Sequence, residues 1–284
     1  MATDKSGWVV GKVLAEQAQT RGEKPFIQFE KGHMYTYSEA HKMGNRAGNG
    51  YAAVGIEFGD NVAVMLNNRL EYLWSWFGLS RIGGVLVGIN TALKGAFLTH
   101  VLTNTRARIG VFEPEFLPWL ADIEDDVVDM AVVYVPGDVY DPDNFPDFKR
   151  IQVKNFDEIM GGPPDDISSE ITYRDIGMIM FTSGTTGPSK GALMPHGHLY
   201  LFGHAMETHL ELTEDDHYYI CMPLFHAQAI MMQFFATLIA GGSAVLAKHF
   251  RATTWIDDIR EHECTVTNLL GVMNDFVLRQ PAKD

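Results

Sequence analysis

Residues 61–90, NVAVMLNNRLEYLWSWFGLSRIGGVLVGIN, decide the fold class. Two short apolar runs, at 61–66 and 85–90, lie on either side of a longer apolar segment. The runs have the length of strands, and the segment between them has the length of a helix. Because both strands are apolar at nearly every position, they predict a parallel sheet whose two faces are covered by helices.

The same alternation continues on both sides of this stretch. Residues 25–29 and 34–37 predict a hairpin, and Thr36 with Glu39 fits a capping box for a helix that runs to about Ala53. Further elements are expected downstream, namely helices at about 95–106, 197–209, 227–240 and 254–262, and strands at 108–113, 176–182, 192–194, 217–222, 243–248 and 265–271.

Residues 137–173 differ in composition, because they are rich in Pro, Gly and Asp. We interpret them as surface loops that join two lobes. The sequence therefore predicts an α/β protein with two lobes of mainly parallel sheet covered by helices. The first lobe, with its connecting loops, is expected to span residues 1–173, and the second lobe residues 174–284.

The composition of the 284 residues excludes several classes of protein. Hydrophobic residues make up 46% and charged residues 20%, which supports a packed core and excludes wholesale disorder. The formal net charge of -14 argues against a nucleic-acid groove or an anionic membrane face. Two cysteines are too few for a disulfide scaffold, and the N-terminus lacks the apolar core of a secretory signal. We therefore expect a cytoplasmic protein.

Residues 227–247 carry no charge and are long enough to cross a bilayer. Gly241 and Gly242 divide them into a helix-length piece and a strand-like piece, and neither piece could span a membrane alone. We therefore predict a buried helix, a turn and a strand, and no transmembrane segment.

The most informative stretch for function is TSGTTGPSKG at 182–191, which follows an apolar strand. Glycines let backbone N–H groups approach a phosphate, hydroxyl groups donate hydrogen bonds to it, and a lysine supplies positive charge. A Walker A loop needs glycine directly before the lysine, whereas Ser189 precedes Lys190 here. A G-x-G-x-x-G fingerprint is also absent, because the glycines of 83–88 are wrongly spaced. The sequence predicts a phosphate loop of another kind.

This loop closely resembles the phosphate-binding signature of the adenylate-forming superfamily, which includes acyl- and aryl-CoA synthetases, peptide-synthetase adenylation domains and luciferases. The usual signature has proline directly before the lysine, whereas Pro188 stands one residue earlier, and we expect this to alter the stiffness of the loop but not its phosphate contact. The motif PLFH at 223–226 resembles the next core motif of the superfamily, which borders the carboxylate pocket. Residues 76–90 and 243–250 are similar to further family segments, so the likeness covers almost the whole chain.

The resemblance implies that the chain is part of the large N-terminal domain of an AMP-forming acyl-CoA synthetase, an acid–thiol ligase. In this reaction a carboxylate attacks the α-phosphate of Mg-ATP to give an acyl-adenylate and pyrophosphate, and the thiol of CoA then displaces AMP. The implied cofactors are ATP, Mg²⁺ and CoA. His226 is implied as the catalytic residue at the acyl pocket and Lys248 as a CoA contact. The expected phosphate-binding residues are Thr182, Ser183, Gly184, Thr185, Thr186, Gly187 and Lys190.

The residues after His226 bear on the substrate. Amino-acid-activating relatives place an aspartate near this motif to pair with the ammonium group, whereas Ala227-Gln228-Ala229 follow here. Because an unpaired buried ammonium group is costly, we expect a fatty, aryl or carnitine-like acid. The layout is most similar to the crotonobetaine/carnitine-CoA ligase and medium-chain acyl-CoA synthetase branches. The histidines of 196–217 match no zinc pattern, so no metal ligand is assigned, and a homodimer is left open.

The motifs that complete the active site in this family come later than the PLFH motif. They are an aromatic-Gly-x-Thr-Glu segment, a ribose-binding aspartate and a mobile C-terminal domain, and none is found before Asp284. We therefore expect this chain to be the front part of the enzyme and to be catalytically deficient alone. Two alternatives stay open: a stand-alone nucleotide-binding module, and a phosphotransferase with an unusual phosphate loop.

Overall fold

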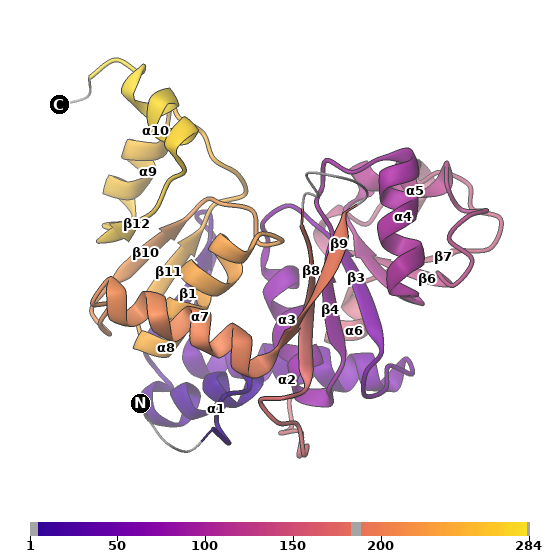
Figure 1. The fold of residues 1–284 in the computed structure, drawn as a ribbon, viewed down its shortest axis with the longest axis horizontal. Coiled ribbons are helices and arrows are strands. Elements are labelled where there is room, and N and C mark those ends of the chain that lie inside the picture. The colour runs from indigo at the N-terminus through magenta and orange to yellow at the C-terminus, as the bar shows by residue number, and fades with distance from the viewer. Residues whose placement is uncertain (1–4, 183–188, 283–284) are drawn as a thin grey trace.

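The computed structural model describes residues 5–182 and 189–282, and it contains two β-sheets that lie side by side with helices between and around them (Figure 1). Most strand pairs in both sheets are parallel. This confirms the expected α/β class with mainly parallel sheets covered by helices.

The larger sheet has seven strands in the order β7-β6-β5-β3-β4-β8-β9. Its neighbouring strands are parallel except for the antiparallel pair β8 and β9. In chain order the strands are β3 (Asn61–Met65), β4 (Val85–Gly88), β5 (Ile109–Phe112), β6 (Val132–Val135), β7 (Gln152–Asn155), β8 (Ile176–Thr182) and β9 (Lys190–Pro195). Strands β3, β4 and β5 are buried almost throughout, as their apolar sequences predict.

The smaller sheet has five strands in the order β12-β10-β11-β1-β2. Strands β1 (Pro25–Phe29) and β2 (Met34–Thr36) form the expected antiparallel hairpin. Strand β1 pairs in parallel with β11, from a distant part of the chain. The remaining strands are β10 (His217–Ile220), β11 (Ser243–Leu246) and β12 (Val266–Thr267).

The division between the sheets does not follow the expected boundary at residue 173. Strands β8 and β9 follow that residue but belong to the seven-stranded sheet, while β1 and β2 precede it but belong to the five-stranded sheet. The expectation that 137–173 is only loops also needs correction, because this segment includes strand β7 and helix α6 (Asp157–Met160). Strand β7 is an edge strand with the polar sequence QVKN, so it lacks the apolar run of a buried strand.

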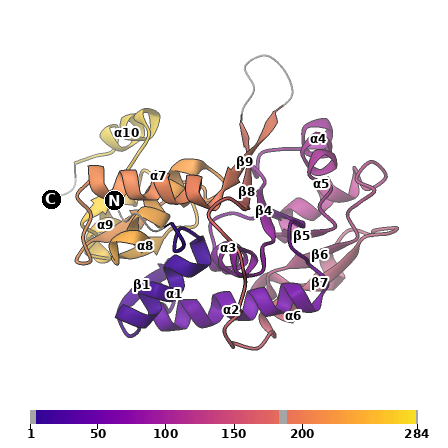
Figure 2. The same ribbon diagram turned by 60° about the horizontal axis from the view of Figure 1, so that its bottom comes forward.

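Helices α2 (Tyr37–Ala53) and α3 (Leu70–Ile82) pack against each other and join the two sheets. Figure 2 shows α2 along the lower side, opposite to the β8–β9 hairpin. A Cβ atom at Gly78 would lie 2.5 Å from the backbone nitrogen of Gly48, so two glycines allow this close packing. The predicted capping box at the start of α2 is confirmed by reciprocal hydrogen bonds between Thr36 and Glu39.

The other helices cover the outer faces of the sheets or lie near the end of the chain. They are α1 (Val10–Arg21), α4 (Gly95–Thr105), α5 (Leu117–Ala121), α7 (His196–His209), α8 (Ala236–Ala240), α9 (Trp255–Glu261) and α10 (Gly271–Leu278). Short 3-10 helices occur at Pro114–Phe116, Gly137–Val139 and Pro142–Asn144. The expected helix at 227–240 is a π-helix at Gln228–Phe235 that continues into α8.

One hydrophobic core runs through both sheets. It contains strand residues from the large sheet and from the small sheet, with α3 between them. The aromatic rings of Trp76 and Phe77 in α3 contact Phe234 of the π-helix, with ring centroids 6.3 and 5.9 Å away. Because α3 is buried on nearly every side, its sequence lacks a polar face.

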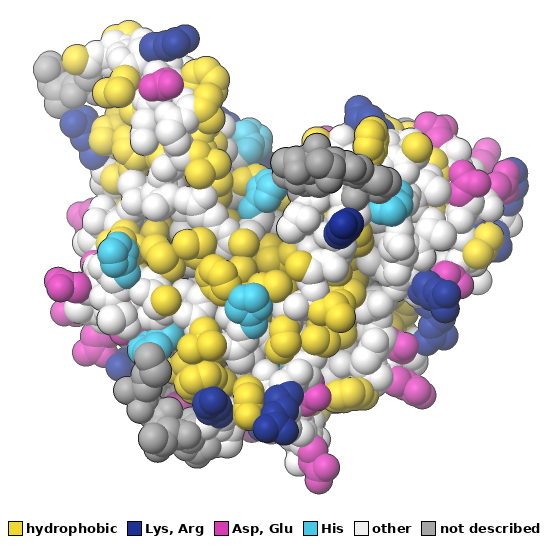
Figure 3. Space-filling model, viewed as in Figure 1, with side chains coloured by type: hydrophobic (Ala, Val, Ile, Leu, Met, Phe, Trp, Pro, Cys, Tyr) yellow, Lys and Arg dark blue, Asp and Glu magenta, His cyan; other side chains and the backbone are white. Residues whose placement is uncertain are grey.

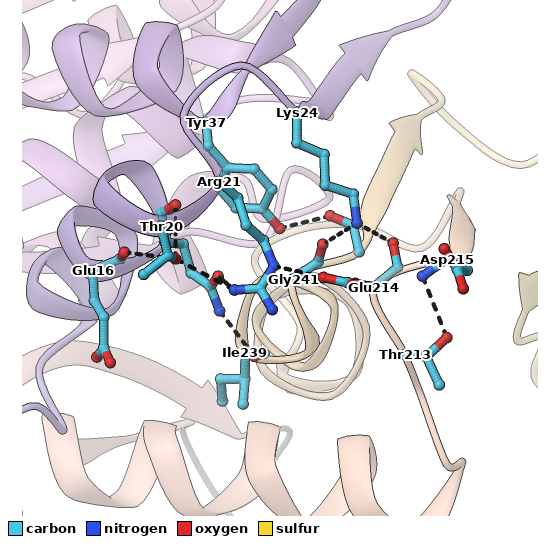
Figure 4. A network of polar contacts seen from close by, with 12 residues as sticks. Glu16, Thr20, Arg21, Lys24, Tyr37, Thr213, Glu214, Asp215, Ile239 and Gly241 are labelled. Atoms are coloured by element: carbon cyan, nitrogen blue, oxygen red, sulfur yellow. Dashed lines mark hydrogen bonds and ion pairs between the residues drawn. The ribbon is translucent and has the colours of Figure 1, made fainter.

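Polar contacts join the end of α1 and the residues after it to the segment before β10 and to the end of α8 (Figure 4). Arg21 pairs with Glu214 at 3.0 Å, and Lys24 Nζ donates a hydrogen bond of 2.8 Å to the carbonyl of Gly241. Gly241 ends α8 with a positive φ of 78°, which suits glycine at a helix C-terminus. A lysine at this end also interacts favourably with the helix dipole.

The uncharged stretch 227–247 is divided by a turn at Gly241. The turn separates α8 from β11 as predicted. Among the helices of residues 5–182 and 189–282, none is both long and apolar enough to cross a membrane.

His196, the first residue of α7, is fully buried and packs against Gly177 of β8. Burial lowers the pKa of His196 to about 4. The unfolded chain takes up this proton near pH 6.5, whereas the folded chain takes it up only near pH 4. The histidine therefore costs stability as the pH falls between these values.

We predict that about 3 kcal/mol of unfolding free energy is lost through this histidine between pH 6.5 and pH 4. His196→Phe should flatten the acid dependence of stability, measured by urea unfolding across that range. His198→Phe is the matched control, because His198 lies two residues along α7 and is exposed. Equal pH dependence in the wild type and His196→Phe would contradict the prediction.

Candidate functional site

The predicted phosphate loop connects β8 and β9 at one end of the large sheet. Thr182 and Lys190 are paired in the β8–β9 register, and both side chains are exposed. The ends of the loop are therefore held together by strand pairing. The predicted residues Ser183, Gly184, Thr185, Thr186 and Gly187 lie outside the described residues.

Helix α4 holds the second end of this loop. His100 Nε2 lies 2.8 Å from the carbonyl oxygen of Ser189, and since a carbonyl can only accept, the ring nitrogen donates. A cavity of about 450 Å³ lies beside this contact, and its lining includes Asn104, Phe181 and Lys190. The sequence analysis did not single out His100, because a histidine in an amphipathic helix carries no motif.

The PLFH motif forms a turn that begins shortly after β10, with Cys221 and Met222 between them. The backbone N–H of His226 donates to the carbonyl of Pro223 at 3.0 Å, and the π-helix begins two residues later. Phe225 is buried, whereas the His226 side chain is exposed and its ring lies 4.6 Å from that of Phe225. The surrounding protein lowers the pKa of His226 by desolvation. His226 is therefore neutral at pH 7 and can donate one hydrogen bond and accept another.

Gly88 is the point where the motif and the loop strands come together. It ends β4, which pairs with β8, and Gly88 stands opposite Met180, two residues before Thr182. A Cβ atom at Gly88 would lie 3.4 Å from the Cα of Phe225 and 2.6 Å from the hydroxyl of Tyr72. The PLFH turn therefore packs directly against the large sheet at Gly88, and the tight approach there is that of the Tyr72 hydroxyl. A glycine at the end of a strand pattern was the available signal.

Lys248 follows β11 in the small sheet. Its backbone N–H donates a hydrogen bond of 2.6 Å to the carboxylate of Glu30, and its side chain is exposed. Strand β11 is the direct neighbour of β10, which leads into the PLFH turn. Lys248 and His226 therefore both follow the carboxyl ends of adjacent parallel strands, where α/β sheets commonly bind ligands.

Hydrophobic side chains gather across the middle of the face seen in Figure 3, and the lysine and arginine side chains on it are scattered. Strand β9 and helix α7 carry large hydrophobic residues that are exposed, namely Leu193, Leu201 and Phe202, of which Leu193 is 61% exposed. Within 5–182 and 189–282, no three His, Cys, Asp or Glu side chains come together as a metal site requires.

The sequence of residues 14–284 matches the family described as AMP-binding enzyme. The chain belongs to the AMP-binding enzyme family. The match covers both sheets, the β8–β9 hairpin and the PLFH turn, so the resemblance seen in the motifs extends through the described fold.

Curated relatives of this AMP-binding chain include crotonobetaine/carnitine–CoA ligases. The protein from Citrobacter koseri is 31% identical over 271 residues, which are 93% of this chain and 51% of that protein. The protein from Salmonella typhimurium is 28% identical over 267 residues, with 92% and 50% covered. The chain thus spans about half the length of the curated relatives it matches.

Solved structures share the fold. A long-chain-fatty-acid-CoA ligase from Archaeoglobus fulgidus superposes with a TM-score of 0.85 at 20% identity, covering 98% of this chain and 54% of that one. The anthranilate CoA ligase AuaEII gives a TM-score of 0.81 at 23% identity, covering 91% and 49%. The described chain therefore has the fold found in the first half of such ligases.

We predict that Gly88→Ala lowers the unfolding free energy by about 1–3 kcal/mol, because the added methyl group overlaps the hydroxyl of Tyr72, which is fully buried. The melting temperature of the variant tests this. Gly271→Ala is the control, since a Cβ atom there meets nothing within 4 Å. If both alanine variants melt like the wild type, the close approach at Gly88 does not exist in solution.

Proposed function

We propose that the protein works as an AMP-forming acyl-CoA synthetase, which activates a carboxylic acid with ATP and transfers it to CoA. The observation that supports this best is the approach at Gly88, because the PLFH turn packs there on β4, the neighbour of the strand that leads into the phosphate loop. Family membership and the curated CoA ligase relatives agree with the proposal.

In the first step, a carboxylate oxygen of the acid would attack the α-phosphorus of ATP. A new bond forms between that oxygen and phosphorus, the bond from the α-phosphorus to the bridging oxygen breaks, and pyrophosphate leaves with the electron pair. Lys190 and the hydroxyl of Thr182 are exposed at the two ends of the loop, where they could bind the β- and γ-phosphates. Ser183, Gly184, Thr185, Thr186 and Gly187 are proposed to complete this phosphate site.

The acid is proposed to lie beside His226. A neutral imidazole can donate a hydrogen bond to the carboxylate and orient it without neutralising the attacking oxygen. Since no carboxylate follows His226 in the turn, an ammonium group of an amino acid would lack a partner. A fatty, aryl or carnitine-like acid is the proposed substrate class, in line with the names of the curated relatives.

CoA is proposed to contact Lys248 in the second step. The thiol sulfur of CoA attacks the acyl carbon of the adenylate, the carbon–oxygen bond to the phosphate breaks, and AMP leaves. The exposed ammonium group of Lys248 suits a phosphate of CoA. Mg²⁺ is proposed to arrive bound to the phosphates of ATP, whose charge it neutralises, because the described residues offer no carboxylate cluster for it.

The reaction is tested by incubating the full-length protein with ATP, CoA and a panel of fatty, aryl and carnitine-like acids. AMP and pyrophosphate should form with at least one acid. Release of inorganic phosphate or transfer of the γ-phosphate, with no AMP, would overturn the proposal in favour of a phosphotransferase.

We predict that Lys190→Ala in the full-length protein lowers kcat/KM for ATP by about tenfold to a hundredfold, the value of a charge-assisted hydrogen bond. Pyrophosphate release at varied ATP concentration measures this. Lys149→Ala is the control, because Lys149 is an exposed lysine paired with Asp125. Unchanged ATP kinetics in Lys190→Ala would remove the residue from the phosphate site.

We predict that Lys248→Ala separates the two half-reactions. The KM for CoA should rise about tenfold, because a contact to phosphate is lost, while pyrophosphate release without CoA keeps its rate. A burst assay without CoA and a steady-state assay with CoA give the two values. A slower release of pyrophosphate without CoA, with the KM for CoA unchanged, would show that Lys248 serves adenylation or folding instead of CoA binding.

A further inference from the structure

Asn68 is a buried polar residue that the sequence analysis did not single out. It lies between β3 and α3, beyond the carboxyl end of a strand of the large sheet, and is 2% exposed. Its side chain nevertheless bonds to the segments that follow β10 and β11 of the small sheet. The amide Nδ2 donates to the carbonyls of Met222 and Ala247, each at 2.9 Å, and Oδ1 accepts from the N–H of Leu224 at 2.8 Å.

These three hydrogen bonds connect the segments after β10 and β11 at the point where the pairing of the two strands ends. The N–H of Ala247 still donates to the carbonyl of Ile220, at 2.9 Å. Beyond that bond, these two described backbone segments no longer pair with each other. The side-chain amide of Asn68 donates two hydrogen bonds to them and accepts one from them. Each partner is a backbone group in a buried region, and such groups are costly to leave unsatisfied.

Each of the bonded segments leads directly into a proposed site residue. Leu224 lies inside the turn that is closed by the hydrogen bond from His226 N–H to the carbonyl of Pro223. Ala247 immediately precedes Lys248, whose own N–H is bound by Glu30. One amide group therefore touches the backbone on the approach to both His226 and Lys248.

We propose that Asn68 is the positioning residue that fixes His226 and Lys248 relative to each other, and so aligns the acid with CoA. This inference rests on the proposed function. Asn68 contacts neither substrate in it and acts through the two backbone segments. The partners of Asn68 belong to segments of the small sheet, whereas Thr182 and Lys190 belong to β8 and β9 of the large sheet, so we expect ATP binding to be independent of Asn68.

The side chain at position 68 must donate two hydrogen bonds and accept one, and the amide of asparagine does both. Asp at 68 would keep the shape and could accept from Leu224, but its second oxygen would face the carbonyls of Met222 and Ala247 without a hydrogen to donate. Ala at 68 would leave all three backbone groups without their partner. Asn68→Asp and Asn68→Ala should therefore behave alike, and Asn68→Asp guards against loss of folding through a cavity.

Asn45 offers a matched control. It is also 2% exposed, and its side chain lies within hydrogen-bond distance of His41, Pro164 and Asp166, none of which is a proposed site residue. Asn45→Ala should lower the melting temperature without changing the kinetic constants of the reaction.

The kinetic test uses the full-length protein, once an accepted acid is known. In Asn68→Asp and Asn68→Ala the KM values for the acid and for CoA should rise by about tenfold to a hundredfold, as expected for displaced binding groups. The KM for ATP should stay within about twofold of the wild type. Equal changes in all three constants, or none, would overturn the positioning role.

A second readout does not depend on activity. The imidazole proton signals of His226, assigned by comparison with His226→Gln, report its pKa, which the surrounding protein lowers in the wild type. In the Asn68 variants the pKa should return toward 6.5, while Asn45→Ala should leave it unchanged. An identical His226 titration in wild type and Asn68 variants would refute the inference. A wild type that forms no AMP from any acid would instead refute the proposed function and leave the titration as the test of positioning.

Discussion

The burial of helix α3 on nearly every side is the constraint on which the rest of the structure depends. Its aromatic residues contact the π-helix on one side and lie against the strands of the large sheet on another. A helix without a polar face must be covered by other apolar residues on all sides. Covering α3 in this way brings the two sheets into one core. Once the sheets share that core, their strand ends must meet, and Gly88 and the PLFH turn lie where they do.

The sequence predicted those helices and strands whose pattern of apolar, capping or turn residues lies within the element itself. The apolar strands, the capping box at Thr36 and Glu39, and the stop at Gly241 depend on neighbours along the chain. Strand β7 was missed because an edge strand can be polar on both faces. The assignment of β1 to the small sheet was missed for another reason, since its partner β11 is far away in sequence and nothing local records such a pairing.

In the candidate site too, some residues could be predicted from local sequence and others could not. Lys190 and His226 were recognisable because motifs of adjacent residues carry them. Asn68 and Gly88 were not, because the importance of each arises from contact with the other sheet. A short polar residue after a strand usually makes a turn, and a glycine at a strand end usually loosens it. Packing against the other sheet gives both residues their role. The position of Gly88 at the end of a strand pattern was a signal for a close approach, but it did not show which segment comes close.

The parallel pairing of β1 with β11 has a consequence for biosynthesis. The β1–β2 hairpin leaves the ribosome early, but the strand that covers its open edge is made only after the whole seven-stranded sheet. The large sheet can therefore assemble first, while the hairpin presents unpaired backbone groups to solvent. The contacts of Arg21 with Glu214 and of Lys24 with Gly241 also form late, because both partners are made after the large sheet. Closure of the small sheet thus completes the N-terminal end of the fold last.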